Sequence, residues 1–118
     1  MTVETIYRNL TPHALYVKAL DGTYITIAPD ERGAARVIYD RLSPEQCRIG
    51  GHEVAVVVAG APREIIGLPE PEEGVVLIVA KAVSDAAPPS RGDLVSPGKL
   101  IRDEDGTVIG CDGLTRRA

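Results

Sequence analysis

His13 is the first residue whose type and position could do chemistry. It directly follows Thr11-Pro12 in the segment NLTPHALYV, residues 9–17. An imidazole can act near neutral pH as a general base, a metal ligand or a contact to an anion. The alternative is structural, because Thr11 can hydrogen-bond locally in a turn and the ring N–H of His13 can cap that turn. The sequence leaves both roles open.

Arginines and a polar loop form the second group of candidates. The segment SRGDLVSPG, residues 90–98, carries Arg91, Asp93 and Ser96, and binding residues are concentrated on loops. Arg91 could hold a carboxylate or phosphate with two parallel hydrogen bonds, and Arg36 could also reach a ligand. The structural alternative is an Arg91–Asp93 ion pair, with Arg36 pointing outward from a strand. The candidate ligand-binding residues are therefore His13, Arg36, Arg91, Asp93 and Ser96.

Cysteine and histidine offer two weaker possibilities. Zinc sites usually contain close pairs such as Cys-x₂-Cys, whereas the nearest pair here, Cys47 and His52, is interrupted by two glycines. With His13 and Cys111, these residues make up the possible ligands. Cys111 could also be a nucleophile beside a histidine, but at the end of the run TVIGC it more simply packs as a small hydrophobe. We predict free thiols, no metal and no cofactor.

The elements that must position these side chains are predicted to be strands. Val and Ile supply 23 of the 118 residues, against nine Leu, and the chain has no Phe or Trp. β-branched side chains lose rotamer freedom in helices and pack well on sheets. The length fits one domain. We therefore predict a single compact β-rich domain over residues 1–118, a small barrel or sandwich with one or two short helices.

Turn signals predict two hairpins within seven to nine short strands. Asp21-Gly22 separates apolar runs at 15–20 and 23–27, and Asp-Gly favours a two-residue type I′ turn. Asp105-Gly106 marks a second hairpin in the last third of the chain. A further strand is expected over 35–39.

The middle of the chain gives mixed signals. SPEQCRIGG, residues 43–51, predicts a short helical turn, since Ser43 and Gln46 can form a capping box. HEVAVVVAG, residues 52–60, is predicted to be the most buried strand. The run from Val75 begins as a strand, and the sequence leaves open whether it becomes helical near Val79.

Charge and hydropathy exclude two classes of partner. The formal net charge is −4, with 13 basic and 17 acidic residues scattered along the chain, so we predict no nucleic-acid binding, which needs clustered Lys and Arg. No apolar run approaches the roughly 18 residues of a membrane span. The N-terminus lacks the pattern of a signal peptide. We expect a cytoplasmic protein that does not bind membranes.

Four segments resemble a known group of sequences. NLTPHA, GLPEPEEGVVLIVAKAV, RGDLVSPG and RDEDGTVIGCDGL are similar to parts of small uncharacterised proteins encoded by phages and by actinobacterial and other bacterial genomes. Those proteins open with Asn-Leu-Thr-Pro-His and close with a Gly-Cys segment, and the resemblance covers nearly the whole chain. Ala80 departs from the Ser expected there, so a role for that hydroxyl does not carry over. The resemblance implies a phage or prophage origin and brings no activity with it.

Three functions are open at this point. The first is a non-enzymatic phage or prophage accessory protein that binds a host protein or a small anionic metabolite, or that forms a homo-oligomer. The second is a small enzyme acting on a polar metabolite through His13 with Arg36 or Arg91. The third is a virion structural β-module, which small size and the lack of a long arm do not favour. If His13, Arg36 and Arg91 converge in one pocket, ligand binding is supported. An exposed apolar patch would instead support a surface that binds another protein.

Overall fold

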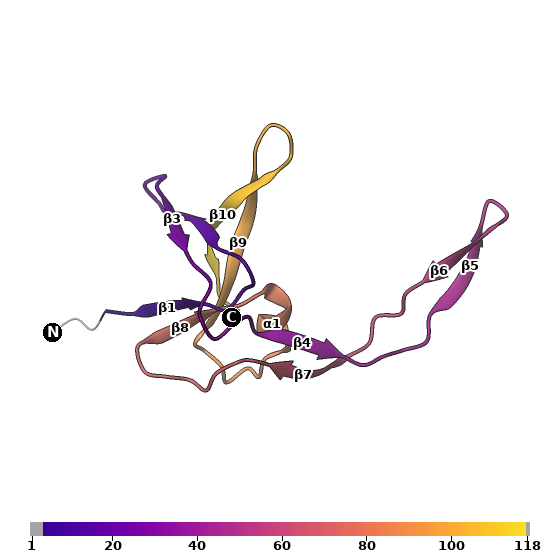
Figure 1. Cartoon of the computed structure of the whole chain (residues 1–118), viewed down its shortest axis with the longest axis horizontal. Helices are drawn as coiled ribbons and strands as arrows, with labels where there is room; N and C mark the ends of the chain where they lie inside the picture. The colour runs from indigo at the N-terminus through magenta and orange to yellow at the C-terminus, as the bar shows by residue number, and fades with distance from the viewer. Residues whose placement is uncertain (1–3, 118) are drawn as a thin grey trace.

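A computed structural model describes residues 4–117 and consists mainly of strands (Figure 1). Six strands form one sheet in the order β1-β8-β9-β10-β2-β3, which nearly closes into a barrel because Asn9 of β1 and Pro29 beyond β3 form a bridge. The prediction of a mainly β fold with a short helix is confirmed. The bounds of these strands are β1 Ile6–Asn9, β2 Leu15–Lys18, β3 Tyr24–Ile27, β8 Val75–Ile78, β9 Leu94–Arg102 and β10 Val108–Thr115.

Pairing in the barrel combines local hairpins with distant parallel contacts. β2 and β3 are antiparallel neighbours, as are β9 and β10. β1 lies parallel to β8, β8 lies parallel to β9, and β2 lies parallel to β10. The first two strands of the chain are therefore held in place by strands from its last third.

Both Asp-Gly hairpins form, but with longer turns than the sequence suggests. The last pair of the first hairpin is Lys18–Tyr24, and the Gly22 N–H donates to the Ala19 carbonyl at 3.0 Å. Gly22 has φ 88°, and no non-glycine residue in the described range has positive φ. A type I turn followed by a left-handed glycine fits these facts, so the predicted type I′ turn is wrong. Gly106 repeats the arrangement in the second hairpin.

The buried residues lie on both faces of the barrel sheet. Leu77 and Leu94 pack with Val83 of the helix α1, Lys81–Ala86, against the outer face. Ile78 and Val95, the next residues along their strands, are also buried, and alternation along a strand sends them to the inner face. The sequence left the segment from Val75 open, and the structure shows a strand that ends at Ile78 and a helix that begins at Lys81.

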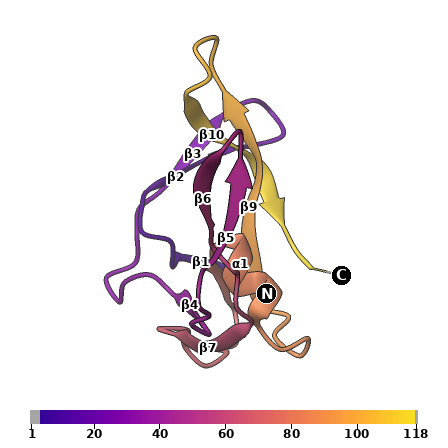
Figure 2. The same ribbon diagram turned by 90° about the vertical axis from the view of Figure 1, so that its right-hand side faces the viewer.

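A long arm, defined here as residues 36–66, leaves the barrel (Figures 1 and 2). Its base is the antiparallel pair β4, Arg36–Tyr39, and β7, Pro62–Ile66; its tip is the hairpin of β5, Glu45–Ile49, and β6, His52–Val56. The molecule measures 67 × 38 × 28 Å with a radius of gyration of 17.9 Å, whereas a compact domain of this length has about 13–14 Å. The expectation that a long arm is lacking is wrong.

Two predictions for the arm are also wrong. Residues 45–49 form strand β5 and not a helical turn, because their backbone groups pair with β6. β6 is exposed throughout, and Val57 after it is 86% exposed, so HEVAVVVAG is not the most buried strand. β8 has that position instead. The apolar residues of this run are exposed because no described segment of the chain other than its partner β5 packs against β6.

Candidate functional site

The segment NLTPH, residues 9–13, is a structural connection, and the side chain of Asn9 makes most of its hydrogen bonds. The Asn9 Oδ1 accepts hydrogen bonds from the Thr11 backbone N–H at 2.9 Å and from the Thr11 hydroxyl at 2.6 Å. The Asn9 Nδ2 donates to the carbonyls of His13 at 2.8 Å and Ile27 at 3.0 Å. Asn9 is 1% exposed. One buried amide thus joins β1, the β1–β2 connection and β3.

His13 contributes its backbone carbonyl to this network, while the residue is exposed. It borders an apolar hollow of about 370 Å³ over β2, β9 and β10, which Cys111 also lines but neither Arg36 nor Arg91 does. Cys111 is 3% exposed, and among the described residues no hydrogen bond links it to His13. A nucleophile and its base need that contact. His13 and Cys111 therefore line the same hollow without forming a hydrogen-bonded pair.

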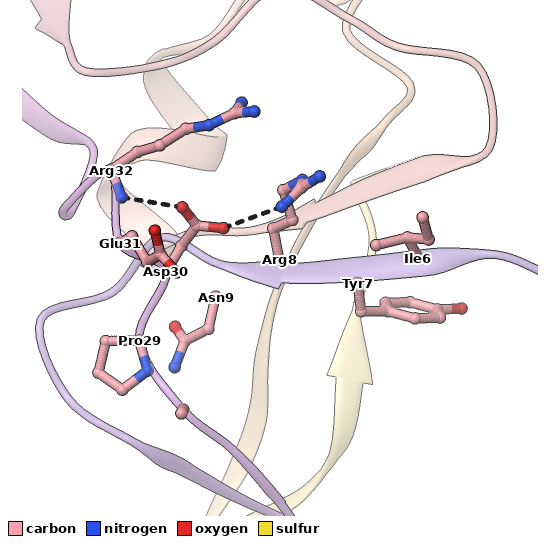
Figure 3. A pocket seen from close by; sticks show the side chains of 9 residues that line it. Ile6, Tyr7, Arg8, Asn9, Pro29, Asp30, Glu31 and Arg32 are labelled. Carbon is pink, nitrogen blue, oxygen red and sulfur yellow. Dashed lines mark hydrogen bonds and ion pairs between the residues drawn. The ribbon is translucent and has the colours of Figure 1, made fainter.

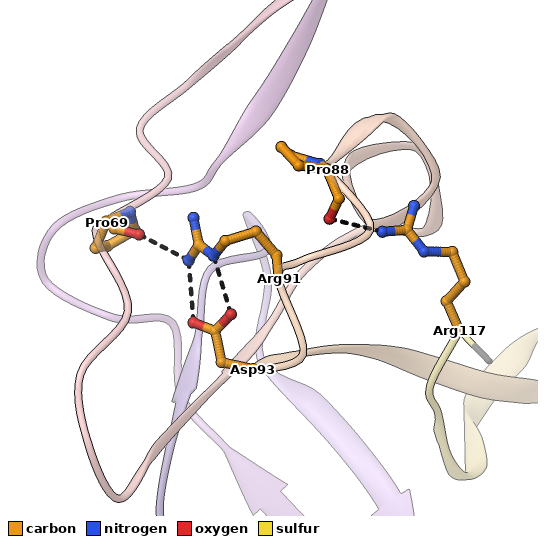
Figure 4. A network of polar contacts seen from close by, with 5 residues as sticks. All are labelled: Pro69, Pro88, Arg91, Asp93 and Arg117. Atoms are coloured by element: carbon orange, nitrogen blue, oxygen red, sulfur yellow. Dashed lines mark hydrogen bonds and ion pairs between the residues drawn. The ribbon is translucent and has the colours of Figure 1, made fainter.

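Arg91 and Asp93 form the ion pair that was the structural alternative (Figure 4). Arg91 Nε and Nη2 donate to the two oxygens of Asp93, each at 3.0 Å, and Nη2 also donates to the Pro69 carbonyl at 2.9 Å. The hydrogen bonds from Arg91 hold the pKa of Asp93 below its usual range. This edge of the guanidinium fastens the loop before β8 to the loop before β9, so it is not free for a ligand.

Ser96 and Arg36 lie on other elements. Ser96 is 4% exposed on β9, opposite Thr115 of β10. Arg36 is exposed at the base of the arm, opposite Ile66 of β7. The predicted residues therefore belong to separate elements, and the hollow that His13 borders includes neither arginine.

A polar hollow that the sequence analysis missed lies beside β1 (Figure 3). It has a volume of about 410 Å³ and is lined by residues 6–9 and 28–32. Arg8 Nη1 pairs with Asp30 Oδ2 at 3.3 Å, and Arg8 Nε is buried without a partner among the described residues. The Arg32 N–H hydrogen-bonds to the Asp30 carboxylate and is the main reason that the pKa of Asp30 is lowered. No motif marks this site, because Arg8 and Asp30 are 22 residues apart in the sequence.

The charges around this hollow limit what it can bind. The unpartnered Nε of Arg8 is buried, so a ligand in the hollow does not reach this donor directly. Arg8 and Arg32 are balanced by Asp30 and Glu31 in the lining, and Glu70 and Glu72 border the adjoining cleft. An added phosphate or dicarboxylate would meet more negative than positive groups. This geometry does not favour a strongly anionic metabolite.

The possible metal ligands are dispersed. Cys47 and His52 belong to the tip of the arm, whereas Cys111 is buried in the barrel. Both cysteines are free thiols. Within residues 4–117, no three His, Cys, Asp or Glu side chains gather in a way that could hold a metal ion.

The tip of the arm is an amphipathic hairpin with an uncovered apolar side. Pairing sets Cys47 opposite Val54 and Glu45 opposite Val56, and side chains alternate along each strand. We call this side the arm face; it is formed by the apolar Cys47, Ile49, Val54 and Val56 together with Glu45 and His52. Ile49 is 63% exposed, Val54 38% and Val56 40%. The opposite side carries Gln46, Arg48, Glu53 and Ala55.

Comparison with known proteins adds no relative: no family model matches the chain, and neither a curated protein nor a solved structure matches it. Within residues 4–117 the structure contains no helix with the length and apolar character that a membrane crossing requires.

Proposed function

We propose that this protein is a non-enzymatic binding module that contacts another protein chain through its arm. The observation that carries this proposal is the arm face, where Ile49, Val54 and Val56 all lie against solvent. A two-stranded hairpin alone is marginally stable in water and needs packing on one face. Contiguous exposed apolar residues on a soluble protein mark a site of interaction. The arm therefore has the composition of a surface that is covered when the protein works.

The shape of the arm supports a protein partner over a small molecule. Both outer edges of the β5–β6 hairpin present unpaired backbone groups, because this two-stranded sheet has no further strand. Such edges accept a strand from another chain. The arm face is a projecting ribbon, whereas small-molecule sites are concave. The enzyme alternative has less support, since the residues proposed for it lie on separate elements.

The arm also changes the balance between accessory protein and virion module. A structural β-module was disfavoured for want of a long arm, and the arm at 36–66 removes that objection. We extend the proposal to a phage or prophage component that assembles with other protein chains. The support for that origin is the resemblance of its sequence motifs alone.

Site-specific photocrosslinking tests the proposed function. A benzophenone amino acid is placed at residue 54 on the arm face and, as the matched control, at residue 55 on the opposite side of the same strand. We expect a discrete crosslinked protein species from position 54 in producing cells and much less from position 55. Equal yields at the two positions, or no species from position 54, would refute arm-mediated binding.

A further inference from the structure

The arm is electrically neutral although the chain is acidic. Arg36, Arg41, Arg48 and Arg63 are balanced by Asp40, Glu45, Glu53 and Glu64. The net charge of −4 therefore belongs entirely to the body, defined as residues 4–35 and 67–117. Two bodies repel each other, whereas two arms do not. A neutral ribbon with an apolar face is suited to another neutral apolar face and not to a charged polymer or lipid surface.

The arm face is also complementary to itself. Cys47 and Val54 form its central pair, with Glu45 and Val56 on the side of the base and Ile49 and His52 at the tip. When a second hairpin is laid face to face about a twofold axis across the strands, its tip lies over the base of the first. Cys47 and Val54 then face the same residues of the second copy, while Glu45 lies over Ile49 and His52 lies over Val56. At each end the carboxylate of Glu45 shares a neighbourhood with the imidazole of His52 from the other copy.

The same arrangement keeps the acidic bodies apart. Antiparallel arms place the two barrels at opposite ends of the ribbon pair, and each molecule is 67 Å long. The Debye length is roughly 8 Å at physiological ionic strength, so charges on the two bodies are screened from each other. A parallel arrangement would bring the two bodies to the same end. Charge thus selects the antiparallel arrangement.

We infer that a second copy of this chain covers the arm face, with arm packed antiparallel against arm about a twofold axis. This inference rests on the proposed function and names its partner. The contact is isologous, since each copy contributes the same residues. Cys47 lies at its centre, facing Cys47 of the second copy, while Cys111 is buried in the barrel.

Light scattering of the purified full-length chain over a range of concentrations tests the inference. We expect a dimer whose dissociation constant rises at least about tenfold in Val54→Glu, because a carboxylate is then forced into an apolar contact. The matched variant Ala55→Glu carries the same charge on the opposite side of the strand and should dimerise as the wild type does. Thermal unfolding of both variants is the control for folding, and each should show the melting transition of the wild-type barrel.

Crosslinking with a short bismaleimide is the second readout, because packed sheets lie about 10 Å apart and a disulfide needs closer Cα atoms. The Cys111→Ser chain should form a dimer crosslinked through Cys47, and the Cys47→Ser chain should not. A chain that is monomeric at every concentration overturns the inference. A dimer that both Glu variants leave unchanged, or that Cys47 does not crosslink, also overturns it.

The photocrosslinking result separates this inference from the proposed function. If position 54 crosslinks to a different protein while the purified chain is monomeric, a second copy is not the partner but the arm is still a binding element. If position 54 crosslinks to nothing, both the inference and the proposed function are refuted.

Discussion

Replacing Asn9 by alanine should destabilise the barrel by removing four hydrogen bonds from one buried side chain. The Thr11 N–H is in a residue only 8% exposed and loses its partner, and an unsatisfied buried donor costs about 1–3 kcal/mol. The carbonyls of His13 and Ile27 belong to less buried residues, so water can replace the amide at a cost of about 0.5 kcal/mol each. We expect a loss of about 3 kcal/mol in the free energy of unfolding.

Urea denaturation and calorimetry of the purified chain measure this loss. For a domain of this size, about 3 kcal/mol lowers the melting temperature by roughly 12 °C. Thr26→Ala, at an exposed position of β3 beside Ile27, is the control and should change stability by less than about 0.5 kcal/mol. If Asn9→Ala loses no more than Thr26→Ala does, the amide does not hold the strands together and the account of the NLTPH segment is wrong.

Two further predictions concern the candidate residues of the loops. The pKa of Asp93 is lowered by its bonds to Arg91, so the ion pair stabilises the fold above about pH 4 and loses that effect as the pH falls further. Asp93→Asn should therefore lower the free energy of unfolding by about 1–2 kcal/mol at pH 7 and by much less at pH 2–3 in urea titrations; an equal loss at both pH values would contradict the ion-pair explanation. His13→Ala removes an exposed ring but keeps the carbonyl that Asn9 uses, so the melting temperature should change by less than about 2 °C, and a larger fall would assign the imidazole a structural role.

The sequence predicted the barrel better than the arm because other parts of the chain bury the barrel strands, whereas the arm strand β6 is exposed. Gly22 and Gly106 at the turns and the β-branched runs around them are local signals, and both hairpins formed. In residues 43–51 the capping box of Ser43 and Gln46 is equally local, but its contribution of about 1 kcal/mol is small beside five backbone pairs with β6. The prediction that Val54 and its neighbours form the most buried strand is wrong, because an apolar run does not show whether another part of the chain packs against it.

The candidate sites could be predicted only where they are local in sequence. Arg91 and Asp93 are two residues apart, and their ion pair was one of two alternatives that the sequence offered. Arg8 and Asp30 are 22 residues apart and meet because the barrel nearly closes between β1 and β3. The role of Asn9 was also missed, since its four partners become known only when β3 is placed beside the β1–β2 connection.

The parallel contacts of β1 and β2 impose an order on how the chain can fold during synthesis. Tyr7 pairs with Val76, and Lys18 pairs with Asp112, so the first twenty residues emerge from the ribosome long before their partners exist. The β5–β6 hairpin needs only its own neighbours and can form early. Barrel closure must wait until β10 has left the exit tunnel, so β1 is unpaired until β8 emerges and one edge of β2 is unpaired until β10 emerges. Overproduction at low temperature with slow initiation should therefore yield more soluble protein than rapid induction.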